Sequence, residues 1–180
     1  MQPLTPDERQ KLQGSLTTLR IIVFALIMGV TAFAAFGIYS QLQKAPQPQP
    51  AVPPAQMNIP QALAIAFAIS AAVISFVVPP LITAPKLETD KTDSRDNAIA
   101  SAAATLQMRT IIACSLLEGA AFFNAFYILT EFSLPNLAAV AVLVGLMALH
   151  FPLAGRYFAK IERLLGVDPF SPAAMTGKYQ

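Results

Sequence analysis

The chain is poor in the residues that build most catalytic and metal sites. Its 180 residues include one cysteine, Cys114, and one histidine, His150. A single cysteine cannot form an intramolecular disulfide, and one cysteine with one histidine cannot complete a structural zinc site. Haem and iron–sulfur groups need additional ligands of the same kinds. We therefore expect no metal ion and no cofactor.

Charged side chains are scarce as well. They make up 12% of the chain, whereas soluble domains carry about 25%. The net charge is only +2, and no basic cluster is interleaved with aromatic residues as nucleic-acid binding requires. The sequence also contains no phosphate-binding loop, dinucleotide fingerprint or nucleophile elbow. We expect neither an enzyme nor a nucleic-acid-binding protein.

Long apolar blocks are what the chain has instead. Hydrophobic residues make up 55% of it, and the mean hydropathy is +0.55. A helix needs about 20 apolar residues to cross the hydrocarbon layer of a membrane. Four blocks meet this requirement, and we predict transmembrane helices over residues 21–40, 59–83, 110–130 and 134–154. The expected fold class is all-α, a polytopic membrane protein with four transmembrane helices in two hairpins.

The apolar blocks have two alternative interpretations besides four spans. A helix in the core of a soluble protein would be shorter and would show a polar face, which none of these blocks has. The first block could also be a secretory signal peptide. Its apolar run is longer than the usual ~7–15 residues, however, and a long segment precedes it. We therefore expect the first block to stay as a span.

Lysine and arginine are distributed unevenly among the segments that connect the spans. Their numbers in chain order are 3, 1, 4, 0 and 4. The residues are Arg9, Lys11 and Arg20, then Lys44, then Lys86, Lys91, Arg95 and Arg109, and finally Arg156, Lys160, Arg163 and Lys178. Cytoplasmic segments of membrane proteins are enriched in these residues. The alternation predicts a multi-pass membrane protein with both termini and the second loop in the cytoplasm.

The segments outside the spans have their own patterns. Thr5-Pro6-Asp7-Glu8 predicts a capped helix start that continues into the first span. The outer loop, 41–58, is rich in proline, which favours an extended spacer. The cytoplasmic loop, 84–109, should become helical from 97 onward. Residues 156–165 predict an amphipathic cytoplasmic helix at the membrane surface, followed by a loose tail.

Small residues and an internal similarity suggest how the helices pack. Alanine and glycine recur every four residues in the first three spans, and such stripes should face other helices. The residues are Ala25 and Gly29, then Ala64, Ala68 and Ala72, then Ala121 and Ala125. Alignment of Arg20 with Arg109 also brings similar residues into register. This register predicts a parallel internal repeat of two hairpins, although chance similarity between apolar helices explains it equally well.

A few polar residues inside the spans form the candidate site. Glu118 lies near the middle of the third span, with Ser115 one turn away and Asn124 further along on a different face. His150 lies at a similar depth in the fourth span, so we predict a Glu118–His150 hydrogen bond. A carboxyl in the membrane often marks an ion path. Alternatively, a neutral Glu118 fixes the packing of neighbouring helices.

A run of residues around Glu118 has a counterpart in a known family. It begins Leu106-Gln107-Met108-Arg109-Thr110-Ile111-Ile112 and continues as Leu116-Leu117-Glu118-Gly119-Ala120. This run resembles the carboxylate-bearing helix of the ATP synthase c subunit, and the small residues at 62, 64, 66, 68 and 70 are similar to its glycine repeat. The resemblance implies ion binding at Glu118. The chain departs from that family by two further spans and by the lack of glycine in the repeat.

The whole chain resembles the small four-helix membrane proteins of bacteria, and this resemblance implies a location in the bacterial inner membrane. Its small size, its small-residue helix faces and its lack of catalytic groups favour a structural or accessory subunit of a membrane complex. The alternative is a proton- or cation-handling protein that uses Glu118. The expected partners are the lipid bilayer and other membrane-protein subunits or a second copy of the chain.

Overall fold

The computed structural model describes residues 3–44, 59–82 and 95–166, and these form five helices. The helices are α1 (Pro6–Gln43), α2 (Ile59–Ile82), α3 (Arg95–Thr130), α4 (Leu134–Leu149) and α5 (Ala154–Leu164). No strand occurs in these ranges, so the all-α prediction is confirmed. Most of the proline-rich outer loop, the first part of the cytoplasmic loop and the C-terminal tail lie outside the described residues.

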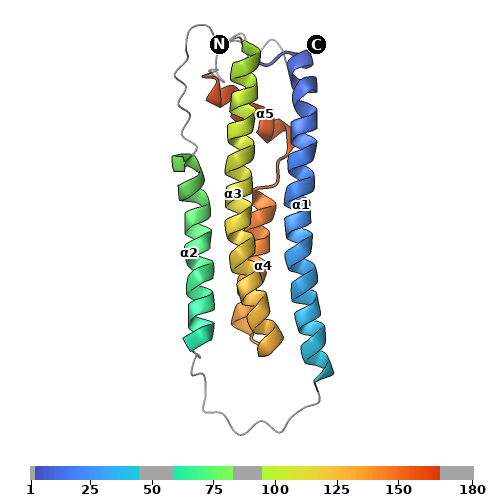
Figure 1. Cartoon of the computed structure of the whole chain (residues 1–180), viewed down its shortest axis with the longest axis vertical. Helices are drawn as coiled ribbons and strands as arrows, with labels where there is room; N and C mark the ends of the chain where they lie inside the picture. The colour runs from blue at the N-terminus through green and yellow to red at the C-terminus, as the bar shows by residue number, and fades with distance from the viewer. Residues whose placement is uncertain (1–2, 45–58, 83–94, 167–180) are drawn as a thin grey trace.

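The helices form an elongated bundle around α3 (Figure 1). Helices α1 and α3 run in one direction, and α2 and α4 run back. Helix α3 packs against all four others, whereas α1 and α2 make no contact with each other within the described ranges. The predicted hairpin of the first two spans is therefore not a packed pair, although α3 and α4 are one. The internal repeat stays a prediction.

Helix α1 starts where its capping residues predict. The Thr5 hydroxyl accepts a hydrogen bond from the Glu8 amide at 3.3 Å, and the Glu8 carboxylate accepts one from the Thr5 amide at 2.7 Å. These bonds satisfy two amides that have no partner within the helix. The helix then continues for 38 residues to Gln43, so the outer loop begins later than position 41.

Three helices, α1, α2 and α3, are long and apolar enough to cross a membrane. Helix α4 has 16 residues, about 24 Å at the usual rise, and is shorter than a hydrocarbon layer of about 30 Å. The predicted span 134–154 is therefore not a single continuous helix. The helix ends at Leu149 because Pro152 lacks an amide donor and disfavours helix at the residue before it.

Helix α5 follows this break at an angle of 65° to α4. We call the end of the bundle that carries α5 the α5 end, and the opposite end, at residues 131–133 between α3 and α4, the turn end (Figure 1). If α4 and α5 are taken as one bent span, the number of possible spans is four. Helix α2, by contrast, continues through Pro79 and Pro80 to Ile82.

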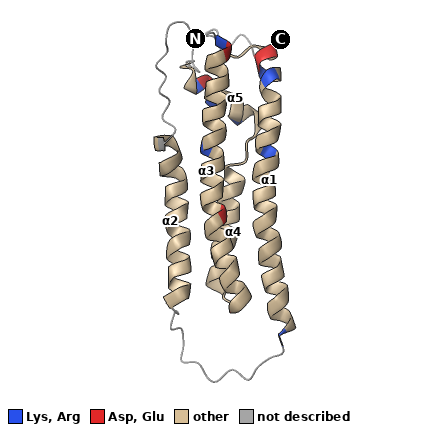
Figure 2. Ribbon diagram, in the orientation of Figure 1, with Lys and Arg blue, Asp and Glu red and all other residues tan. Residues whose placement is uncertain are grey.

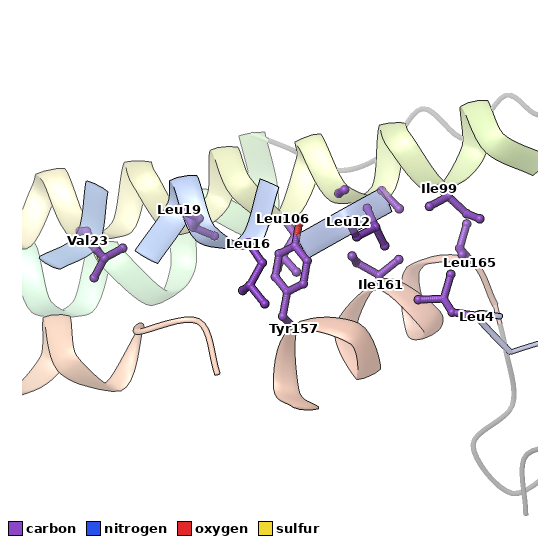
Figure 3. Packing of buried hydrophobic residues seen from close by; sticks show 13 residues of the cluster. Leu4, Leu12, Leu16, Leu19, Val23, Ile99, Leu106, Tyr157, Ile161 and Leu165 are labelled. Atoms are coloured by element: carbon purple, nitrogen blue, oxygen red, sulfur yellow. The ribbon is translucent and has the colours of Figure 1, made fainter. Parts of the chain in front are cut away.

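The apolar face of α5 packs on protein. Tyr157 and Ile161 are buried, and Leu165 follows them into the same cluster of side chains from α1 and α3 (Figure 3). The sequence predicted an amphipathic helix on the membrane surface, and its apolar face lies against the bundle instead. This α5 cluster joins the N-terminal halves of α1 and α3. Its other members include Leu4, Leu12, Leu16, Leu19, Val23, Ile99 and Leu106.

Small residues allow the helices to approach closely in the middle of the bundle. Ala64, Ala68, Ala121 and Ala125 are buried, as the stripes predicted. In the first span, Ala25 and Gly29 are exposed, although a Cβ atom at Gly29 would lie 3.7 Å from the Phe122 ring of α3. Gly37 makes the close contact of α1 instead. A Cβ atom at Gly37 would lie 3.6 Å from the Ala125 carbonyl oxygen, so the two backbones nearly touch.

Charged residues gather at the α5 end, whereas the middle of the bundle is almost free of them (Figure 2). Arg95 at the start of α3 binds the Glu8 carboxylate at 2.7 Å. Two further ion pairs join neighbouring helices at this end. They are Lys11–Asp96 at 3.3 Å and Arg9–Glu162 at 3.1 Å. Together these pairs tie α1 to α3 and α5.

The Glu8–Arg95 pair predicts a loss of stability in acid. The Arg95 hydrogen bond, followed by the Thr5 amide, lowers the pKa of Glu8 from 4.5 to about 2. The carboxylate therefore stabilises the fold above about pH 4.5, and this contribution disappears as the pH falls toward 2. Because Arg95 is partly exposed, we expect a loss of about 1 kcal/mol. Thermal unfolding of the detergent-solubilised protein, followed by circular dichroism across this pH range, measures it.

The control variants separate this carboxylate from general acid effects. Glu8→Gln should be less stable than the wild type near neutral pH and should lose less stability across the same window. Asp7→Asn leaves both capping bonds and the Arg95 contact in place, so it should follow the wild-type curve. A wild-type curve that stays flat between pH 4.5 and 2 would contradict the assignment.

Candidate functional site

The four polar residues that the sequence singled out do not converge in one place. Glu118 is partly exposed on α3, and Ser115, one turn before it, is exposed. Asn124 is fully buried between α3 and its neighbours, and His150 lies in the break after α4. The structure therefore holds three separate polar features: the Glu118 face, an amide network at the turn end, and a cavity near His150.

The predicted Glu118–His150 hydrogen bond is not formed. The Nε2 atom of His150 is buried and has no partner in the described part of the chain. The His150 ring lies against Phe76 of α2 instead, with 5.1 Å between ring centres. On α3, Leu117 and Ala121 are among the fully buried side chains near the level of Glu118, while Glu118 itself stays partly exposed.

The surroundings of Glu118 are apolar and open. The described residues provide no hydrogen bond or ion pair for its carboxyl group. Gly119 beside it is exposed, and a Cβ atom added there would meet nothing within 4 Å. On this part of α3, Phe122 packs against Phe33 of α1 and Phe123 against Phe67 of α2. The exposed positions Ser115 and Gly119 therefore lie between the two flanking helices.

Asn124 forms the centre of an amide network at the turn end. Its side-chain amide donates to the Ala64 carbonyl of α2 at 3.0 Å and to the Ala120 carbonyl at 2.9 Å. Its side-chain oxygen accepts a hydrogen bond of 3.0 Å from the amide of Asn136 on α4. Both asparagines are fully buried. One side chain thus links α2, α3 and α4.

The network continues to the surface through two more residues. The Ser133 hydroxyl donates to the Asn136 side-chain oxygen at 2.8 Å, and Gln61 of α2 donates to Ser133 at 2.7 Å. Asn124 was predicted from the sequence as a site residue, whereas Asn136, Ser133 and Gln61 were not. The sequence contained a signal for this pairing, because both asparagines stand in otherwise apolar segments and a buried amide needs a hydrogen-bond partner. The network contains no ionisable group, so it suits packing rather than proton transfer.

A basic cavity of about 370 Å³ lies near the α5 end. It opens between α2, α3 and α5, beside the break that holds His150. Arg109 of α3 and Lys160 and Arg163 of α5 line it, and no acidic residue is among the described residues of its wall. The α2 side of the wall is apolar and consists chiefly of Phe76, Pro79 and Pro80.

Comparison with known proteins identifies no relative. The chain matches no family model, no curated protein and no solved structure. The resemblance of the third span to the ATP synthase c subunit stays a prediction. Among the residues that the structure describes, no group of three or more His, Cys, Asp or Glu side chains could hold a metal ion.

The three polar features differ in what they can do. The amide network is neutral and its members bond to one another, so it holds three helices in register. The Glu118 face offers a carboxyl group to whatever lies beside α3. The basic cavity offers positive charge next to an apolar wall. The last two can bind something from outside the chain.

Proposed function

We propose that the protein is a multi-pass membrane protein that serves as an accessory subunit, binding a partner helix along the Glu118 face of α3. Three long apolar helices and the bent α4–α5 pair support insertion into a membrane. So does the outward surface of α1 and α2, which carries large apolar side chains. Examples are Phe24, Phe36, Leu63, Ile69, Val73 and Phe76, all at least half exposed.

The charge distribution supports one orientation of this bundle. The α5 end carries Arg and Lys side chains from α1, α3 and α5, while Lys44 is the basic residue of the described chain at the turn end (Figure 2). Cytoplasmic segments carry the excess of such residues. We therefore place the α5 end, and with it both termini, on the cytoplasmic side of a bacterial inner membrane.

The unpartnered carboxyl of Glu118 carries the accessory-subunit proposal. An ionised carboxylate in the hydrocarbon layer costs at least about 2.5 kcal/mol, and such groups normally face a partner. The chain provides none within its described residues, and the adjacent Ser115 and Gly119 are small and exposed. Small residues permit close helix contact, and a polar group on the partner would complete the bonding of Glu118.

Gly119→Leu tests this proposal with little effect on the isolated chain. A Cβ atom at this position meets nothing within 4 Å in this protein, whereas a leucine side chain would obstruct a partner helix, so the complex recovered in mild detergent should fall at least about tenfold. Gly145→Leu on α4 is the matched control, since a Cβ atom there also meets nothing within 4 Å. Size-exclusion chromatography with mass analysis of co-purifying subunits measures the result.

The amount of partner complex recovered should also depend on Glu118 itself. Glu118→Leu should weaken the complex as strongly as Gly119→Leu, because it removes the group that the partner completes. Glu131→Gln, at an acid that accepts a hydrogen bond from Tyr127 at the turn end, should leave it intact. The proposal fails if the wild-type chain purifies only as a monomer, or if both leucine variants keep the wild-type complex.

The alternative is a proton- or cation-handling role for the same carboxyl. Its support is the partial exposure of Glu118, which would let an ion or a carboxyl-directed reagent reach it. In vesicles, proton flux and carbodiimide labelling should then both be lost in Glu118→Gln. Unchanged flux and labelling in this variant would exclude the ion-handling role and leave the accessory role standing.

A further inference from the structure

Two cations of the basic cavity, Lys160 and Arg163, differ from the paired cations of the α5 end. Arg9, Lys11 and Arg95 each pair with an acidic residue of a neighbouring helix. Lys160 and Arg163, one turn apart on α5, form no ion pair within the described residues, and both are exposed. Their charges, with that of Arg109, therefore converge on a space whose described wall supplies no acid.

The opposite wall of the cavity is apolar and reaches the outer surface of α2. Phe76 is 52% exposed, and Leu81 one turn and a half later is 70% exposed, so this side of α2 would face lipid in a membrane. Pro79 and Pro80 supply no backbone amide donors, and they form part of this wall. A ligand in the cavity would therefore touch positive charge on one side and an apolar, lipid-facing helix on the other.

The short segment between α4 and α5, beside the cavity, contains a polar atom with no hydrogen bond to the described residues. The Nε2 atom of His150 is buried and lacks a hydrogen bond in the described part of the chain, and His150 lines the cavity. Buried polar atoms in folded proteins are nearly always satisfied by protein, water or a ligand. An occupant of this region that carries polar groups would place a bonding partner close to the ring.

We propose that the basic cavity binds the phosphate headgroup of an anionic phospholipid from the α5-end leaflet. Arg109, Lys160 and Arg163 hold the phosphate, and the first carbons of an acyl chain lie along Phe76. A lipid fits better than a soluble phosphate because half of the wall is apolar and continues onto the exposed face of α2. This inference rests on membrane insertion, which is part of the proposed function, and it does not require the partner helix.

Native mass spectrometry of the full chain released from nanodiscs tests the lipid site. The nanodiscs contain phosphatidylcholine with a minor share of phosphatidylglycerol, and the measured quantity is the phosphatidylglycerol retained by the protein. The Lys160→Gln/Arg163→Gln double variant should retain it at least about tenfold more weakly than the wild type. Arg156→Gln removes an exposed α5 charge outside the cavity wall and should stay within about twofold of the wild type.

The other possible results show whether the cavity binds a lipid, binds a free anion or only contributes to nonspecific charge attraction. Equal retention of phosphatidylglycerol by the wild type and the double variant overturns the proposal, and so does an equally large loss in Arg156→Gln. Displacement of the lipid by inorganic phosphate would show that the site takes a free anion, and it also overturns the lipid assignment. Circular dichroism verifies that the variants fold. Gly119→Leu should keep the lipid, so failure of the lipid site and failure of the partner face are distinguishable.

Discussion

Replacing Ile161 by alanine is expected to lower the free energy of unfolding by about 2–4 kcal/mol and to release α5 from the bundle. Ile161 is fully buried in the α5 cluster, where its neighbours come from α1 and α3 (Figure 3). Helix α5 has 11 residues, too few to remain helical in water on its own. Its helical structure therefore depends on this packing, together with the Arg9–Glu162 pair.

Hydrogen exchange locates this effect and denaturant unfolding gives its size. In Ile161→Ala, the amides of α5 should exchange faster, while those in the middle of α3 change little. Leu153→Ala is the control, because Leu153 precedes α5 and is 50% exposed. It should change stability by less than about 0.5 kcal/mol. Equal exchange of α5 in the wild type and Ile161→Ala would mean that the α5 cluster does not hold this helix.

Replacing Asn124 by leucine is expected to cost about 2 kcal/mol of stability in bilayer-like detergent or bicelles. The variant loses three hydrogen bonds and leaves the Ala64 carbonyl and the Asn136 amide without this partner. Single hydrogen bonds between helices in membranes contribute about 0.6 kcal/mol on average, and unsatisfied partners add to the loss. Thermal or denaturant unfolding of the reconstituted protein measures the difference.

Two further variants test that the Asn124 effect arises between helices. Thr31→Val removes a hydroxyl that bonds only to the Ile27 carbonyl of its own helix, so it should change stability by less than about 0.5 kcal/mol. The Asn124→Leu/Asn136→Leu double variant should cost less than the sum of the two single variants, because both ends of the bond are removed together. Additive costs would contradict a direct Asn124–Asn136 interaction.

The helices and their starting points could be predicted from local sequence. Thr5 and Glu8 define a cap through contacts three residues apart, and long apolar runs must satisfy their own backbone as helices. Proline inside a span predicts a kink or an end of the helix, at Pro79-Pro80 and at Phe151-Pro152 alike, and the helix ends only at the second site. A proline removes one backbone hydrogen bond of the helix, and the resulting loss of helix stability depends on whether neighbouring groups compensate for that bond. At Pro79 and Pro80 of α2 the helix continues, whereas at Pro152 it breaks.

The Glu118–His150 prediction failed because depth along a helix does not fix rotation about its axis. The two residues lie at similar heights by residue count, yet the core face of α3 at that level is set by Leu117 and Ala121. The same limit explains α5. Amphipathic spacing identifies an apolar face, but only the fold decides whether lipid or protein covers it. Here Tyr157 and Ile161 meet α1 and α3.

The amide network and the basic cavity needed long-range contacts to be found. Asn124 and Asn136 are close in the chain and bond to each other. The bond from Asn124 to Ala64 of α2 joins residues far apart in the sequence, so it depends on how α2 packs. The cavity likewise collects Arg109 from one segment and Lys160 and Arg163 from another. The positive-inside rule counts each of these charges within its own segment, and it does not predict which side chains lie close together in the fold.

Cysteine labelling in spheroplasts tests the central claim, that lipid surrounds the bundle with its α5 end in the cytoplasm. In a Cys114→Ala background, Gln43→Cys, Arg156→Cys and Phe67→Cys place one thiol at the turn end, at the α5 end and on the exposed side of α2. A membrane-impermeant maleimide should label the first in intact spheroplasts, the second only after lysis, and the third in neither. Labelling at position 67 as rapid as that at 43 would contradict the account.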